Sequence, residues 1–182
     1  MTARRQPVPE ARLVPTEAGL RPEGDGWFVV NVADAMAAGI DDEQYGIAFE
    51  GEHGAFPHFG VNVSVLGPGR AAAMYHAEAG QEAFLVLAGE CVLIVEERER
   101  RLRRWDFVHC APRTAHVIVG AGEEPCAVLM IGARNAGSEI VYPVSPAAAR
   151  HGAGVEEETT DPREAYADWL PLRGGRFPWP PA

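Results

Sequence analysis

The feature that most constrains the fold is the stretch from Gly67 to His116, where ionisable side chains recur inside apolar, strand-forming runs. His76 and Glu78 stand two residues apart, Glu82 opens the next apolar run, and His116 follows much later. Burying an imidazole or a carboxylate without a partner costs free energy. A divalent metal ion would serve as a common partner for two histidines and one or two glutamates, so this stretch predicts a metal site.

Short apolar segments at close intervals predict an all-β fold. They occupy residues 61–65, 83–87, 91–95, 105–110, 117–119 and 126–131. Segments repeated at roughly 8–12-residue spacing are typical of a β-sandwich or a β-barrel. We therefore predict a barrel, with short helices only outside residues 67–132.

The middle of the chain resembles the cupins, and we identify it as a small single-domain member of that superfamily. The first cupin motif reads G-x5-H-x-H-x3,4-E-x6-G. This chain reads His76-x-Glu78-x3-Glu82-x6-Gly89, so Glu78 takes the place of the second histidine.

The second cupin motif, G-x5-P-x-G-x2-H-x3-N, is matched less closely. His116 stands at its histidine position. Ala111, Arg113 and Gly120 stand where the motif has proline, glycine and asparagine.

The resemblance implies a double-stranded β-helix, also called a jelly-roll barrel, formed by residues 61–135. Residues 1–60 are then an N-terminal arm with one or two strands packing on the barrel, and residues 136–182 a C-terminal arm with short helices. A divalent metal ion would be held by His76, Glu78, Glu82 and His116.

The chemistry of these four residues narrows the choice of ion. Residues two apart in a strand share a face, so His76 and Glu78 project together. Nitrogen and carboxylate ligands suit Zn, Fe, Mn, Ni or Co, and two histidines with one carboxylate also form the ligand set of non-haem iron oxygenases. Protonation competes with metal binding, so the sequence predicts that metal affinity falls below about pH 6.

Two kinds of function remain open. The first is an enzyme that acts on a small organic molecule in the barrel by dioxygen-dependent oxidation or by isomerisation, with the metal as Lewis acid and Glu78 as base if it is not a ligand. The second is a non-catalytic protein that binds a small molecule and whose metal site is degenerate. In that case the same residues form a hydrogen-bonded polar core.

Three further histidines carry weaker signals. His109 alternates with Phe107 on an expected strand and is the next candidate for a residue that faces the barrel. His53 and His58 lie in a glycine-rich segment without a matching partner spacing.

Charge and cysteine content exclude some partners. The formal net charge of −10 over 182 residues argues against binding to nucleic acid or to anionic membranes. No apolar run reaches the length of a membrane span, and no apolar segment of a signal peptide follows the first charges. Cys91, Cys110 and Cys126 lie in apolar runs without paired spacing, which predicts buried reduced thiols and a cytoplasmic location.

The apolar run at residues 83–87 has no polar face. One face of this strand would line the barrel, and the other needs a second sheet, an arm or another subunit to cover it. Together with the pairing common among cupins, this predicts a homodimer.

The flanks give local predictions. Residues 27–32 favour a strand, and residues 33–38 favour a short helix that ends at Gly39. Ser145 with Pro146, and Asp161 with Glu164 at the capping-box position, each predict a helix start.

Aromatic residues near the C-terminus predict contacts with the barrel. Tyr166, Trp169 and Leu170 have the spacing of one helix face. The proline-rich tail with Phe177 and Trp179 is expected to be extended and to pack over the barrel.

Overall fold

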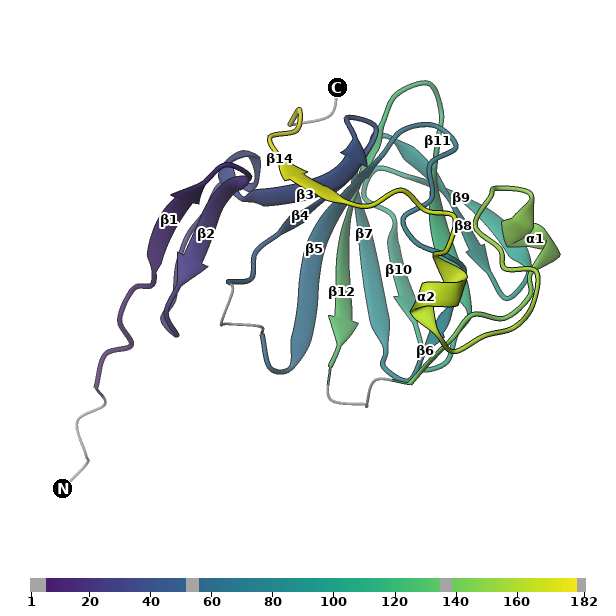
Figure 1. Cartoon of the computed structure of the whole chain (residues 1–182), viewed down its shortest axis with the longest axis horizontal. Helices are drawn as coiled ribbons and strands as arrows, with labels where there is room; N and C mark the ends of the chain where they lie inside the picture. Colours follow the sequence, from purple (N-terminus) through teal and green to yellow (C-terminus); the bar gives the residue numbers. More distant parts are fainter. Residues whose placement is uncertain (1–5, 52–55, 135–138, 180–182) are drawn as a thin grey trace.

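The computed structural model describes residues 6–51, 56–134 and 139–179, and it consists largely of antiparallel strands (Figure 1). The strands are β1 (Arg12–Thr16), β2 (Gly19–Glu23), β3 (Met36–Asp41), β4 (Gln44–Ala48), β5 (Phe59–Leu66), β6 (Ala77–Glu78), β7 (Glu82–Ala88), β8 (Glu90–Val95), β9 (Arg98–Arg103), β10 (Phe107–Cys110), β11 (His116–Ala121), β12 (Cys126–Ala133), β13 (Ile140–Val141) and β14 (Arg173–Gly175). The helices are the 3-10 turn η1 (Val32–Asp34), α1 (Pro146–Ala149) and α2 (Pro162–Ala165).

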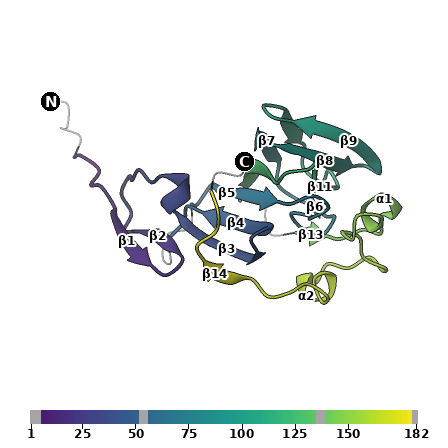
Figure 2. The same cartoon turned by 90° about the horizontal axis from the view of Figure 1, so that it is seen from above.

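Two sheets enclose the barrel interior. One has the order β10-β7-β12-β5-β4-β3-β14, and the other has the order β11-β8-β9. Phe84, Val86 and Val128 of the larger sheet pack against Leu93 and Ile118 of the smaller one. Figure 2 shows the smaller sheet on one side of the molecule and the β1–β2 hairpin projecting at the far end. The predicted all-β fold is thus confirmed.

The helices lie outside the barrel strands, as predicted. The Ser145 side chain accepts a hydrogen bond from the Ala148 backbone at the start of α1, and Asp161 accepts one from Arg163 at the start of α2. Glu164 does not complete the capping box, because its carboxylate accepts a hydrogen bond from the Thr159 hydroxyl. None of the helices in the described parts of the chain is long and apolar enough to cross a membrane.

The strand predicted at residues 27–32 and the helix predicted at residues 33–38 are both wrong. Only Trp27 of the first segment joins a strand ladder, through an isolated bridge to Glu10. The second segment begins as η1 and continues into β3, which pairs with β4. Tertiary pairing overrides the local helix signal here. Gly39, expected to end a helix, allows β3 to approach Tyr45, since an added Cβ atom would lie 2.4 Å from the Tyr45 Cβ atom.

The C-terminal tail covers part of the outer face of the larger sheet. Phe177 and Trp179 pack against a cluster that includes Val63, Val65 and Ala127. The rings of Phe177 and Tyr45 stack with 4.7 Å between their centroids. The expected packing of these aromatic residues on the barrel is therefore confirmed.

The segment after α2 follows its prediction only partly. The Tyr166 and Trp169 rings contact one another edge to face, with centroids 5.1 Å apart. Leu170 leaves this contact and is 66% exposed, so the three residues do not share one buried face. The reason is that α2 ends at Ala165, before any of them.

The three cysteines are buried and free, as predicted.

Candidate metal centre

A backbone bridge places His76 beside His116. The His76 amide donates to the His116 carbonyl at 3.1 Å, and the His116 amide donates to the His76 carbonyl at 2.9 Å. His76 lies just before β6, and His116 is the first residue of β11. The antiparallel bridge therefore joins the two motif regions and buries both rings, which are 9% and 3% exposed.

Each imidazole ring is fixed by its own neighbouring backbone. The His76 Nδ1 atom lies 2.7 Å from the Met74 carbonyl oxygen, and the His116 Nδ1 atom lies 2.9 Å from the Thr114 carbonyl oxygen. A carbonyl oxygen can only accept, so each Nδ1 carries the proton and each Nε2 keeps a free lone pair. This is the hydrogen-bonding pattern that orients histidines as metal ligands.

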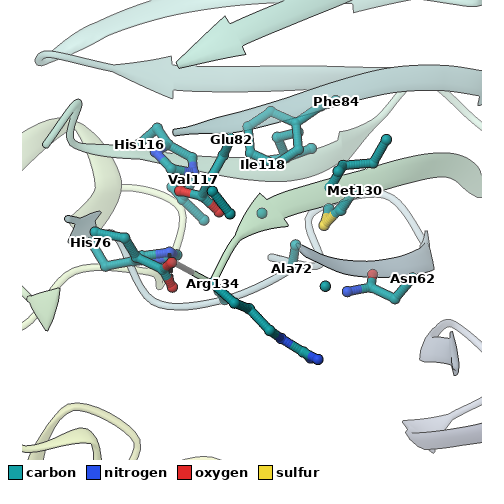
Figure 3. Close-up of a pocket in the computed structure, with 16 residues that line it drawn as sticks. Asn62, Ala72, His76, Glu82, Phe84, His116, Val117, Ile118, Met130 and Arg134 are labelled. Atoms are coloured by element: carbon teal, nitrogen blue, oxygen red, sulfur yellow. Dashed lines mark ion pairs between the residues drawn. The ribbon is translucent and has the colours of Figure 1, made fainter. Parts of the chain in front are cut away.

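Glu82 completes a group of three donors. It opens β7 and projects from the same face as Phe84, into the barrel. Its Oε2 atom lies 3.3 Å from the His116 Nε2 atom. One donor atom from each of His76, Glu82 and His116 can be chosen so that all three lie within 4.8 Å of one another. Figure 3 shows Glu82 and His116 reaching toward one another, with His76 facing them.

These distances place the three donor atoms near enough to approach a shared divalent ion. Bonds of about 2.0–2.2 Å from each donor to a central ion require donors only a few ångströms apart. The donor set, two imidazole nitrogens with unshared lone pairs and one carboxylate, has the right chemistry for Zn or Fe. The three residues therefore combine suitable donor chemistry with proximity, and binding an ion would draw the donor atoms closer together than the 4.8 Å within which they lie.

Glu78 faces the same cavity but stands apart from the group of three. Its Oε1 atom lies 3.8 Å from the His76 Nε2 atom, and its side chain is 38% exposed. His76 and Glu78 thus project to the same side, as their spacing indicated. The greater exposure of Glu78 leaves its carboxylate accessible to a molecule in the cavity.

Burial controls the protonation of this group. Desolvation lowers the pKa of His76 and of His116, and it outweighs the opposite effect of the backbone hydrogen bonds. Desolvation, reinforced by the charge of Glu78, raises the pKa of Glu82 to about 7, although His76 acts in the opposite direction. Near neutral pH the rings are therefore neutral, and the Glu82 carboxyl is the group that holds an exchangeable proton.

The cavity at this centre has a volume of about 240 Å³. Beside the predicted residues it is also lined by Asn62, Phe84, Met130 and Arg134, which occupy none of the defined positions of either cupin motif. A signal for Asn62 existed, since residues 61–65 alternate and place their polar residues on one face. Arg134 carried no such signal.

Of the three weaker histidine candidates, His58 and His109 do not line this cavity. His109 is exposed and pairs with Ala83 on the outside of the larger sheet, so it does not face the barrel. His58 is exposed, and its carbonyl accepts a hydrogen bond from Arg134. His53 lies outside the described residues.

Two departures from the second cupin motif have structural explanations. Arg113, at the glycine position, has a φ of 67°, which is a left-handed backbone conformation that glycine adopts most readily. Gly120, at the asparagine position, lies against the chain at residue 67, where an added Cβ atom would be 2.1 Å from the Gly67 carbonyl oxygen. A side chain at position 120 has no room.

Comparison with known proteins agrees with this fold. Residues 62–132 match the family model of the cupin domain. No curated protein matches the chain.

Several solved structures share the architecture. A sugar phosphate isomerase from a cupin superfamily, from Silicibacter pomeroyi, is 19% identical with a TM-score of 0.51, over 62% of this chain and 85% of its own. A polyketide cyclase from Streptomyces resistomycificus is 15% identical with a TM-score of 0.50, over 58% of this chain and 78% of its own.

A candidate sugar phosphate isomerase from Acidithiobacillus ferrooxidans is 30% identical over 46% of this chain, with a TM-score of 0.42. The match spans about half of that protein, 54% of its length. At these identities and scores, the similarity concerns the fold.

Proposed function

Because residues 62–132 form a cupin domain, we propose that this protein binds one divalent metal ion through His76, Glu82 and His116. The ion would act on a small organic molecule bound in the adjoining cavity. The observation that carries the proposal is the pair of Nδ1–carbonyl hydrogen bonds, which leave both Nε2 atoms free beside the Glu82 carboxylate.

The ion would supply Lewis acidity and a template for orienting the bound molecule. Three protein donors leave coordination positions open, which catalytic sites require. Zn, Fe, Mn, Ni and Co all accept this donor set.

The chain's own residues would position the molecule and move its proton. Phe84 packs against the His116 ring, with 5.1 Å between centroids, and shields it from one side. In this proposal Glu78 is the general base, because it is the carboxylate of the cavity that is both accessible and outside the group of three. Removal of a proton from the carbon beside a carbonyl group, followed by its return to a neighbouring carbon, would give isomerisation, and dioxygen-dependent oxidation is the other reaction type that open positions allow. Consumption of dioxygen during turnover separates the two.

A second candidate function is small-molecule binding without metal. It is supported by the Glu82 carboxyl, whose raised pKa of about 7 allows a protonated, hydrogen-bonded partnership with His116 at 3.3 Å. Such a polar core needs no ion.

Metal analysis of protein purified without an affinity tag tests the proposal. We expect about one ion per chain after loading with Fe(II), Co(II) or Zn(II), strongly reduced in His116→Ala. His109→Ala is the matched control, since this histidine lies on the outer face, and its metal content should equal that of the wild type. A folded His116→Ala protein with full metal occupancy would overturn the proposed site, and a wild type that takes up no metal would favour the second candidate.

We also propose that two copies of the chain pair through the outer face of β10, β7, β12 and β5. Phe107, Ile131 and Phe59 are 66%, 38% and 46% exposed, and the strand registers place them on this one face. Burying these residues against a second copy would remove their apolar surface from water. Sedimentation at micromolar concentration should show a dimer that Phe107→Glu converts to monomer. A wild type that sediments only as a monomer contradicts this pairing.

A further inference from the structure

A second cavity, of about 640 Å³, lies beside the metal centre. Its floor is the inner face of β4 and β5, where Gly46 pairs with Ser64 and Ala48 pairs with Asn62. Its other wall is the segment after α2, residues 166–172, which we call the strap. In Figure 1 the strap runs from α2 toward β14 and crosses in front of the larger sheet.

The groove adjoins the metal-centre cavity. Asn62 and Ala72 line both cavities. Figure 3 shows Asn62 on the opposite side of the view from His76, with Ala72 drawn between them. A molecule bound at His76, Glu82 and His116 can therefore extend past Asn62 into the groove.

The lining of the groove is apolar and aromatic. Trp169, Leu170 and Leu172 line it from the strap, and Leu170 and Leu172 are each 66% exposed. A ligand that removes exposed apolar side chains of this size from water lowers the free energy of the complex, so their exposure favours binding of an apolar ligand. Ser64 and Asn62 add isolated polar groups, a mixture typical of small-molecule sites.

The two cavities offer few cationic side chains that could bind a ligand with a phosphate group. None of the described residues that line the groove is charged at neutral pH, and Arg134 is the single arginine among those described around the metal-centre cavity. Its guanidinium lies 2.8 Å from the Glu50 carboxylate and donates to the Phe56 carbonyl at 3.0 Å. A phosphate would have to compete with Glu50 and would also face the carboxylates of Glu78 and Glu82.

We propose that the groove is the second compartment of the binding site and that it selects the substrate class. The substrate has a metal-chelating pair of oxygens at one end and a hydrocarbon chain or an aromatic ring system at the other, rather than a phosphate. This inference rests on the proposed metal site for the chelating end. It rests on the groove for the apolar end.

Gly46 offers a way to fill the groove. A Cβ atom added there meets no atom within 4 Å, so Gly46→Leu would project its side chain into the open space above the floor. Ala167 is exposed on the strap and does not line the groove, so Ala167→Leu adds similar bulk outside it and is the matched control. Ala48→Leu is a second filling variant should Gly46→Leu fail to fold.

The first measurement needs no metal. The neutral fluorophore N-phenyl-1-naphthylamine is titrated into the metal-free protein. Wild type and Ala167→Leu should bind it equally, and the folded filling variant should bind it at least about tenfold more weakly, because the buried apolar area is lost. Equal affinity in wild type and in both filling variants would overturn the inference.

The second measurement tests whether one ligand occupies both the metal site and the groove. Acetohydroxamate and octanohydroxamate share a chelating group and differ in chain length, and both are titrated into Co(II)-loaded protein by calorimetry and cobalt absorption. A fully buried methylene contributes roughly fourfold in affinity, so the longer compound should bind at least about 50-fold tighter to the wild type. In the filling variant this ratio should fall to within a few-fold.

The outcomes separate the two proposals. Equal affinity of both hydroxamates for the wild type, with a changed cobalt spectrum, overturns the apolar compartment and leaves the metal site standing. An unchanged cobalt spectrum together with the expected fluorophore result overturns the metal site and supports the groove as an apolar binding compartment.

Discussion

The metal-centre cavity, or metal end, and the groove, or apolar end, differ in how firmly their side chains are held. At the metal end, His76 and His116 are joined by two backbone hydrogen bonds, and each ring is held by a further one. At the apolar end, the strap is fixed by Tyr166, whose hydroxyl accepts a hydrogen bond from the Met74 amide at 3.1 Å, and by the pairing of β14 with β3. Residues 170–172 between these anchors make no hydrogen bond to other described residues.

This difference matches what the two regions would bind, an ion at the metal end and a hydrocarbon at the apolar end. Groups that must meet an ion need fixed positions, because donor distances tolerate little variation. Groups that contact a hydrocarbon need only present apolar surface, because the hydrophobic effect has no preferred direction. Substitutions in the strap should therefore change which molecules bind, whereas substitutions at the metal end should abolish the site.

The largest expected effect concerns the metal end. His76→Ala should lower metal affinity by more than about 100-fold, since loss of even an outer partner of a ligand costs roughly 10–100-fold. Trp169→Ala should leave metal affinity within about twofold, because additivity holds for distant sites without shared partners. Competition with a chromophoric chelator measures both. A comparable loss in Trp169→Ala would show that the two ends are not independent.

The next effect is a pH dependence confined to the metal end. With neutral rings and a Glu82 pKa of about 7, metal must displace the Glu82 proton below that pH. Metal affinity should fall by about tenfold per pH unit below about pH 7, rather than from about pH 6 as the unperturbed values predict. Binding of N-phenyl-1-naphthylamine at the groove should stay unchanged over the same range. A metal affinity that is flat between pH values of about 5 and 7 would contradict the assignment of Glu82.

A smaller effect concerns the stability of the metal-free protein. Because folding raises the pKa of Glu82 above its ordinary value of 4.5, its stabilising contribution is complete below that value and is lost as the pH rises through about 7. Glu82→Gln should therefore stabilise the metal-free protein above neutral pH by about 1–3 kcal/mol, and much less in acid. Urea unfolding at both pH values measures this. Glu78→Gln is the control, and an equal gain in that variant would argue against burial as the cause.

The smallest expected effect concerns the strap at the apolar end. Tyr166→Phe removes the acceptor of the Met74 amide and should cost about 1 kcal/mol of stability. Fluorophore binding at the groove should weaken a few-fold while metal content stays unchanged. Tyr75→Phe serves as the control, because that buried tyrosine is not among the described residues that line the groove.

Much of the metal end could be predicted because its signals are local. The spacing of His76 and Glu78 fixes their common side, since neighbouring side chains in a strand alternate between faces. Glu82 opens the next strand as expected, and the cap residues Ser145 and Asp161 start their helices. The outward position of His109 could not be predicted with the same certainty, because alternation relates it to Phe107 without saying which face is inside.

The all-β class, the candidate donors and the burial of the thiols could be predicted from the sequence, because each depends on composition or on local spacing. Tertiary structure alone decided that residues 36–41 form a strand and that the apolar groove exists. Gly46, Asn62 and Trp169 meet in that groove from three separate segments of the chain. Their contact depends on which strands pair and where the strap crosses, and the periodicity of any one segment carries no information about either.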